Sequence, residues 1–216
     1  MSYVPCAEVG SDLYDVKHLD GGRSLVMAGD AAGKGLGAAI LVSSIVPAAE
    51  VLLQTGQGLL DIVRTLNRQV CATTDAVRYA TLFVGLLDRA SGRLEYVNAG
   101  HNAPLLIDAG GGVAALEATG MPVGMLEEAP FETADARLEP GSLLAVFSDG
   151  ITEAVGRGEE FYGEERLTRA LLDARSLSAQ AVSESAMRDL ASFTSGTPQS
   201  DDIVLVVVRR TQLPRS

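Results

Sequence analysis

The order in which strand and helix signals follow one another constrains the fold of this chain more than any other feature of its sequence. Short apolar runs of strand length alternate with two groups of amphipathic segments that have helical spacing. Because the helical segments are grouped rather than alternating singly with strands, the order argues against a doubly wound parallel sheet and favours an α+β layered architecture. We expect strands at residues 24–28, 81–87, 93–97, 143–147 and 203–208, and helices at 35–53, 58–73, 163–174 and 179–193.

The length and charge of the chain limit both its domain count and its partners. A chain of 216 residues suits one domain, and we expect a single domain over residues 1–216. The 28 acidic and 17 basic side chains give a formal net charge of −11. Nucleic acids and anionic membranes attract basic surfaces, so the composition disfavours both as partners.

Targeting signals and disulfide patterns are not visible in the sequence. The N-terminus has neither a basic region nor an apolar segment of signal-peptide length. Serines, a proline and a glutamate interrupt the apolar stretch 38–53, so we do not expect it to span a membrane. Cys6 and Cys71 are interpreted as buried thiols in a reducing compartment. We therefore expect a soluble, cytoplasmic protein.

Acidic residues stand at the ends of several expected strands. Asp30 and Asp149 follow apolar runs, Asp201–Asp202 precede the last run, and Asp12 and Asp15 border an early alternating segment. Carboxylates that converge repel one another unless a cation lies between them, and oxygen ligands without thiols or imidazoles suit Mg²⁺ or Mn²⁺. Each acid also has a structural interpretation, as a helix N-cap for Asp30 and Asp149 and as a turn residue for the others. Spacing alone leaves both interpretations open.

The segment Gly29–Gly35 is similar to a phosphate-binding loop between a strand and a helix. A P-loop has four residues between its first glycine and the Gly-Lys pair, followed by Ser or Thr. Here three residues intervene and Gly35 follows Lys34, so the motif is broken. We interpret these glycines as allowing the backbone and the following helix to pack closely around Asp30.

The two histidines form no metal-binding motif with each other. His18 lies in a segment with the pattern of a surface strand. His101 lies in a turn, Asn98–Pro104, after an expected strand. We interpret His101 as a hydrogen-bonded loop residue, with a place next to a functional site as the alternative.

Seven segments, in order along nearly the whole chain, resemble the SpoIIE-type phosphatase domain, a branch of the metal-dependent (PPM, type 2C) Ser/Thr protein phosphatases. The segments are Glu8–Val16, Gly29–Gly35, Ala80–Phe83, Asn98–His101, Ser148–Ala154, Phe161–Leu167 and Asp201–Ile203. One such match is weak, whereas seven in the family's order are specific. The resemblance implies a four-layer αββα sandwich, with two mainly antiparallel sheets flanked by helix pairs.

The resemblance also implies a centre of two Mn²⁺ or Mg²⁺ ions. The implied ligands are the side chains of Asp12, Asp30, Asp149 and Asp201 and the backbone carbonyl of Ala31, with Asp30 bridging both ions and Asp15 and Asp202 as supporting acids. The implied reaction is direct hydrolysis of phosphoserine or phosphothreonine by a water activated between the ions. The implied substrate is a phosphorylated anti-sigma-factor antagonist or a similar bacterial regulator, with an upstream sensor or activator as a further partner.

Some positions depart from the family pattern. Ser11 stands where glycine is commoner, and Val204 stands where the family usually has threonine. Ala7 lies near the position of the arginine that binds phosphate in eukaryotic relatives, so neither a phosphate clamp nor a general acid is identified, and Lys34 is one substitute.

These departures keep two other functions under consideration. One is a catalytically weak or inactive binding module of the same fold that sequesters a regulatory partner. The other is a nucleotide-binding protein that uses Gly29–Gly35, which the broken motif disfavours.

Overall fold

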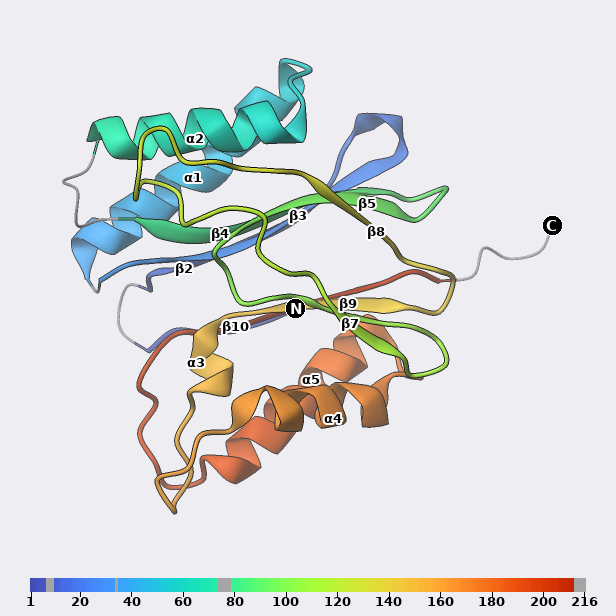
Figure 1. Cartoon of the computed structure of the whole chain (residues 1–216). Coiled ribbons are helices and arrows are strands. Elements are labelled where there is room, and N and C mark those ends of the chain that lie inside the picture. Colours follow the sequence, from blue (N-terminus) through green and yellow to red (C-terminus); the bar gives the residue numbers. More distant parts are fainter. Residues whose placement is uncertain (7–9, 34, 74–78, 212–216) are drawn as a thin grey trace. The chain divides into compact units, whose positions relative to one another are not determined.

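The computed structural model describes residues 1–6, 10–33, 35–73 and 79–211, and these contain ten strands, five α-helices and one 3₁₀ turn (Figure 1). The chain divides into two compact units. Unit 1 comprises Met1–Cys6, Pro104–Leu116 and Leu138–Ser216, and unit 2 comprises Ala7–Ala103 and Glu117–Arg137. Ala7 and Lys34, which the sequence singled out, lie outside the described residues.

Unit 2 contains a five-stranded antiparallel sheet in the order β2-β3-β4-β5-β8. Its elements are β2 (Asp12–His18), the 3₁₀ turn η1 (Asp20–Gly22), β3 (Arg23–Ala31), α1 (Leu36–Gln54), α2 (Leu59–Thr73), β4 (Ala80–Asp88), β5 (Arg93–Ala99) and β8 (Ala134–Arg137). Both helices cover one face of this sheet (Figure 1). Alternate strand residues, among them Leu25, Met27, Leu82 and Val84, point to that face and form a buried core with the helices.

Helix α1 is unusually apolar for a helix of a compact domain. By length and composition alone it would suit a membrane span. Seven of its side chains between Ala38 and Leu53 are nevertheless buried, and six of these belong to the core of unit 2, whereas Leu36, Ile40 and Val51 are exposed. A core helix passes the same test of composition, so one such helix, about a third of whose apolar window is buried here, is weak evidence for a membrane span.

Unit 1 contains the second antiparallel sheet, in the order β1-β10-β9-β6-β7. Its elements are β1 (Ser2–Val4), β6 (Leu105–Ile107), β7 (Val113–Ala115), β9 (Leu143–Phe147), α3 (Asp149–Thr152), α4 (Gly163–Ala174), α5 (Ala179–Phe193) and β10 (Ile203–Arg209). Leu143, Ala145 and Phe147 alternate along β9 toward Leu171 and Val182 of the two long helices. This unit therefore has its own apolar core of sheet and helices.

The predicted α+β class with two antiparallel sheets and paired helices is confirmed. Every long element expected from the sequence is present, with bounds that differ by three residues or fewer. The expected burial of both thiols is wrong, because Cys6 is exposed and Cys71 is only partly buried. The single domain over residues 1–216 stays a prediction.

Candidate functional site

Two of the predicted ligands lie side by side in unit 2. Asp12 begins β2 and Asp30 lies near the end of β3, and their Cα atoms are paired directly across the antiparallel ladder. Residues paired in this way project to the same face with Cβ atoms roughly 5 Å apart. Both side chains are partly buried, so two like charges face each other with limited access to water. A cation between these carboxylates would offset their repulsion.

The backbone beside Asp30 is held on both edges. The N–H of Ala31 donates to the carbonyl of Ser11 at 3.1 Å, which ties β3 to the residue before β2. A Cβ at Gly29 would lie 2.4 Å from the carbonyl oxygen of Thr81 on β4, so only glycine allows this approach of the two strands. A glycine therefore does permit close packing next to Asp30, as expected, but the element that packs there is strand β4 and not a helix.

The other two predicted ligands lie at one end of unit 1. Asp149 is the first residue of α3, directly after β9, and Asp201 lies two residues before β10. The hydroxyl of Ser148 donates to the carbonyl of Asp202 at 3.2 Å and accepts from the N–H of Val204 at 2.9 Å. Ser148 is buried, and these two bonds hold the start of α3 against the start of β10. We call this pair of hydrogen bonds the Ser148 latch, and the segment that it holds the latched turn.

Gly150 shows how closely these two segments approach. A Cβ at Gly150 would lie 1.9 Å from the carbonyl oxygen of Asp202, a distance that no side chain tolerates. The glycine after Asp149 is therefore needed for α3 to begin where it does.

The adjacent acids Asp201 and Asp202 have different surroundings. Asp202 is 4% exposed, and its Oδ1 accepts the N–H of Cys6 at 2.6 Å, so this carboxylate fixes the end of the N-terminal strand. Asp201 is less buried; its Oδ1 accepts the N–H of Asp202 at 2.9 Å, and its carbonyl accepts from Gln199 at 2.7 Å. Asp202 therefore has a structural role, while Asp201 combines a turn-type hydrogen bond with a more accessible carboxylate.

Asp15 does not join Asp12. They are three positions apart along β2, so their side chains point to opposite faces of the sheet. Asp15 faces α1, which carries Glu50, and Oε2 of Glu50 lies 2.6 Å from Nζ of Lys17. Burial raises the pKa of Asp15, and the Glu50 carboxylate raises it further, whereas Lys17 lowers it.

The N-cap interpretations of the acids are wrong. Helix α1 begins at Leu36 with Gly35 as its N-cap, and Asp30 lies inside β3. The N-cap of α3 is Ser148, and Asp149 lies within the first turn. Both acids are thus placed by strands and a latched turn rather than by a capping role.

The donor set fits a hard divalent cation, since it consists of carboxylates and a backbone carbonyl. Asp12 and Asp30 are brought together within unit 2, and Asp149 and Asp201 lie at one end of unit 1. Within the part of the chain that the structure describes, no group of three or more His, Cys, Asp or Glu side chains is gathered as a metal site. The complete ligand set of Asp12, Asp30, Ala31, Asp149 and Asp201 therefore stays a prediction.

Two hydroxyl residues beside these acids escaped the sequence analysis. Thr81 is the Cα partner of Asp30 on β4, and its Oγ1 accepts the N–H of Asp30 at 3.2 Å. Ser148 forms the latch described above. In the sequence each appears only as a polar residue next to an apolar run, and such a pattern does not reveal the hydrogen-bond partner of the hydroxyl group.

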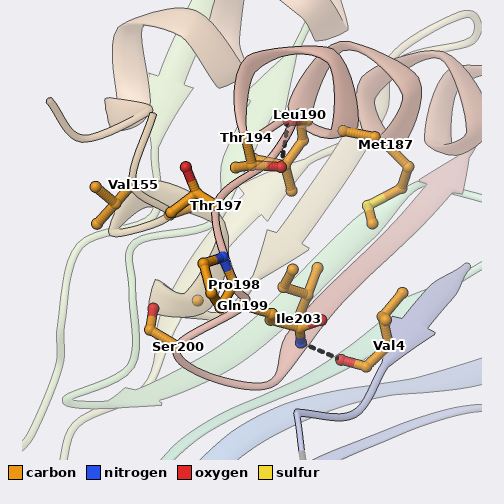
Figure 2. Close-up of a pocket in the computed structure, with 13 residues that line it drawn as sticks. Val4, Val155, Met187, Leu190, Thr194, Thr197, Pro198, Gln199, Ser200 and Ile203 are labelled. Atoms are coloured by element: carbon orange, nitrogen blue, oxygen red, sulfur yellow. Dashed lines mark hydrogen bonds between the residues drawn. The ribbon is translucent and has the colours of Figure 1, made fainter. Parts of the chain in front are cut away.

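A pocket of about 190 Å³ opens in unit 1 beside the latched turn (Figure 2). Gly150 and Ser200 line it, and these are the chain neighbours of Asp149 and Asp201. Its walls also include Val4, Ala154, Met187, Leu190, Thr197 and Gln199. Because the walls are mostly apolar, the pocket suits an apolar group, and a cavity of roughly 150 Å³ already holds a benzene ring.

Comparison with known proteins places the sequence in a bacterial protein family. Residues 20–211 match the family model described as Stage II sporulation protein E (SpoIIE). The chain is 27% identical over 235 residues to Protein IcfG of Synechocystis sp., covering 96% of this chain and 37% of that protein. It is also 27% identical over 208 residues to phosphoserine phosphatase RsbU of Bacillus subtilis, covering 96% of this chain and 61% of RsbU. The chain thus spans less than two thirds of the length of either relative.

Solved structures share the fold. The SiaA-PP2C domain of Pseudomonas aeruginosa superposes with a TM-score of 0.85 at 20% identity, covering 96% of this chain and 84% of that domain. At this identity the likeness establishes the PP2C fold alone.

Proposed function

Because the chain belongs to the SpoIIE family, we propose that it is a metal-dependent protein serine/threonine phosphatase that acts as a single domain in the cytoplasm. The observation that carries the proposal is the direct pairing of Asp12 with Asp30 across β2 and β3. A pair of partly buried, facing carboxylates destabilises the fold unless a cation offsets its charge, so this arrangement indicates a binding role rather than a structural one.

In this proposal Asp12, Asp30, Asp149, Asp201 and the carbonyl of Ala31 hold two Mn²⁺ or Mg²⁺ ions. Such ions, when bound, lower the pKa of a water and offset the negative charge of a phosphoryl group. The chain contributes rigid oxygen ligands, because the β2–β3 ladder fixes one pair and the Ser148 latch fixes the other. This route requires no covalent enzyme intermediate.

The proposed substrate is a phosphoserine or phosphothreonine of a regulatory protein, such as a phosphorylated anti-sigma-factor antagonist. The name of RsbU, a phosphoserine phosphatase, supports this substrate class. The net charge of −11 favours a protein partner with basic surface near its docking site.

The test measures hydrolysis of p-nitrophenyl phosphate and of a phosphoserine peptide, with Mn²⁺ and then with EDTA. We expect turnover that depends on Mn²⁺ and falls at least about 100-fold in Asp30→Asn and in Asp149→Asn, since even an outer residue of a metal site changes activity by 10–100-fold. Asp61→Asn, on the exposed face of α2, is the control and should keep full activity. Metal-independent turnover, or unchanged turnover in both variants, would contradict the proposal. Partner binding without any turnover would instead support the binding module.

A further inference from the structure

The hydrogen bonds around Asp30 lead to a residue that the proposed metal centre does not use, His101. We propose that Thr81 and His101 are positioning residues, which orient the carboxylate of Asp30 toward a divalent cation. This inference rests on the proposed function and extends it, because it assigns what holds one of the proposed ligands.

Thr81 is the direct neighbour of Asp30. The two residues are Cα partners across β3 and β4, so their side chains share the face of the sheet that also carries Asp12. The N–H of Asp30 donates to Oγ1 of Thr81 at 3.2 Å. The Thr81 hydroxyl therefore holds the backbone at the residue whose carboxylate must point in one direction.

His101 in turn fixes the Thr81 hydroxyl. Its Nδ1 lies 3.0 Å from Oγ1 of Thr81, and the imidazole is 5% exposed. A threonine hydroxyl has one proton to donate. Its oxygen also has two lone pairs, so Oγ1 can accept the N–H of Asp30 and at the same time bond to Nδ1, as donor or as acceptor according to the tautomer of the ring. His101 thereby selects one rotamer of Thr81.

The turn after β5 is built to place His101 there. The side-chain oxygen of Asn98 accepts the N–H of His101 at 2.8 Å, and the fully buried Asn98 is itself fixed by two hydrogen bonds with Thr119. Gly100 has a φ of +71°, and a Cβ there would lie 2.7 Å from Cδ of Pro122. Glycine is required between Asn98 and His101, so the Asn98–His101 segment acts as one positioning unit.

The chain contains a matched control at the other end of the same hairpin. Nδ1 of His18 lies 2.9 Å from Oγ of Ser24, and these residues are Cα partners of β2 and β3. His18 and Asp12 are six positions apart along β2, which corresponds to about 20 Å of extended strand. The His18–Ser24 pair has the same chemistry as the His101–Thr81 pair but no acid beside it in the ladder.

The experiment measures Mn²⁺ affinity by calorimetry on the full chain, together with Mn²⁺-dependent turnover of p-nitrophenyl phosphate. Thr81→Val keeps the shape of the side chain and removes its hydroxyl, and we expect it to raise the Kd for Mn²⁺ 10–100-fold. Thr81→Ser retains the hydroxyl and should stay within about threefold of the wild type. His101→Gln should weaken binding in the same direction, and combining it with Thr81→Val should add little, because the two residues act as one unit. Ser24→Ala should leave the affinity unchanged.

Thermal unfolding without metal separates positioning from loss of fold. Wild-type affinity in a folded Thr81→Val would overturn the inference, and so would equal weakening by Thr81→Ser and Thr81→Val. If Thr81→Val does not fold, Thr81→Ser and His101→Gln decide the question, and wild-type affinity in His101→Gln would overturn the inference. A wild-type chain that binds no Mn²⁺ would overturn the proposed function and this inference with it, whereas Mn²⁺ binding with no effect of these variants overturns the inference alone.

Discussion

The two units hold their acids by different physical means. In unit 2, Asp12 and Asp30 form the end pair of a ladder, where the register of seven residue pairs fixes their backbone positions. In unit 1, Asp149 and Asp201 lie just outside the strands, where two hydrogen bonds of the Ser148 hydroxyl and one of the Gln199 amide help to hold the segments that carry them. A ladder distributes its restraint over many bonds, so we expect the unit 1 acids to be more sensitive to single substitutions.

In each unit, nevertheless, a glycine lies next to one of these acids. Replacing that glycine should lower the free energy of unfolding more than the other substitutions considered below. We expect Gly150→Ala to lower the free energy of unfolding by at least about 3 kcal/mol, because its Cβ would meet a backbone oxygen that cannot rotate away. Gly29→Ala should cost less, since the corresponding approach is 2.4 Å rather than 1.9 Å. Urea unfolding measures both.

Gly58→Ala is the matched control for this pair. Nothing lies within 4 Å of a Cβ at Gly58, and its φ is not positive, so we expect a change within about 1 kcal/mol. A Gly150→Ala variant as stable as this control would contradict the close approach at the start of α3. A larger loss of stability in Gly29→Ala than in Gly150→Ala would show that unit 2, and not unit 1, is more sensitive to such a substitution.

The Ser148 latch tests the same comparison with a smaller change. Ser148→Ala leaves the N–H of Val204 and the carbonyl of Asp202 without their side-chain partner in a buried place, so we expect a loss of about 1–3 kcal/mol. Turnover should fall as well, because Asp149 follows the latch directly. The control is Ser43→Ala, on the exposed face of α1, which should change the stability by less than about 0.5 kcal/mol. Full stability in Ser148→Ala would show that the latch does not hold the turn.

The sequence predicted those parts of the fold that local pattern determines. Strand β9 and helices α4 and α5 have the predicted bounds, because each has a continuous apolar run or a clear helical period. The three-residue strands β1 and β7 carry too few residues for a pattern, and β7 is exposed along its length. The four-residue α3 is set by the Ser148 latch, which no local signal encodes.

The candidate site, like the fold, could be predicted only in part from the sequence. That acids end strands is visible in the sequence, but the pairing of Asp12 with Asp30 depends on the register of β2 and β3. The opposite orientation of Asp15 follows from the alternation of a strand, once the bounds of β2 are known. Thr81 was missed because only the register of β3 and β4 shows that it lies beside Asp30.

The smallest predicted effect concerns Asp15, which sharpens the contrast between the two faces of β2. Burial and the Glu50 carboxylate raise the pKa of Asp15 above its ordinary value of 3.8, so the folded state binds more protons than the unfolded state as this group titrates. Stability therefore decreases as the pH rises from that ordinary value through the folded-state pKa, and at neutral pH the ionised Asp15 destabilises the fold. Asp15→Asn removes this ionisation, so we expect it to raise the free energy of unfolding at pH 7 by less than about 1 kcal/mol.

The gain should shrink toward zero as the pH falls below the ordinary value of 3.8, because the carboxyl of the wild type is then protonated in both states, and urea unfolding at pH 7 and at such an acidic pH measures it. Asp20→Asn, in the exposed η1 turn, is the control and should keep the stability of the wild type at pH 7. Mn²⁺ affinity should not change in Asp15→Asn, because Asp15 faces α1 while Asp12 faces the opposite side of the sheet. A loss of Mn²⁺ binding in this variant would place Asp15 in the metal site and show that the two faces of β2 are not separate in function.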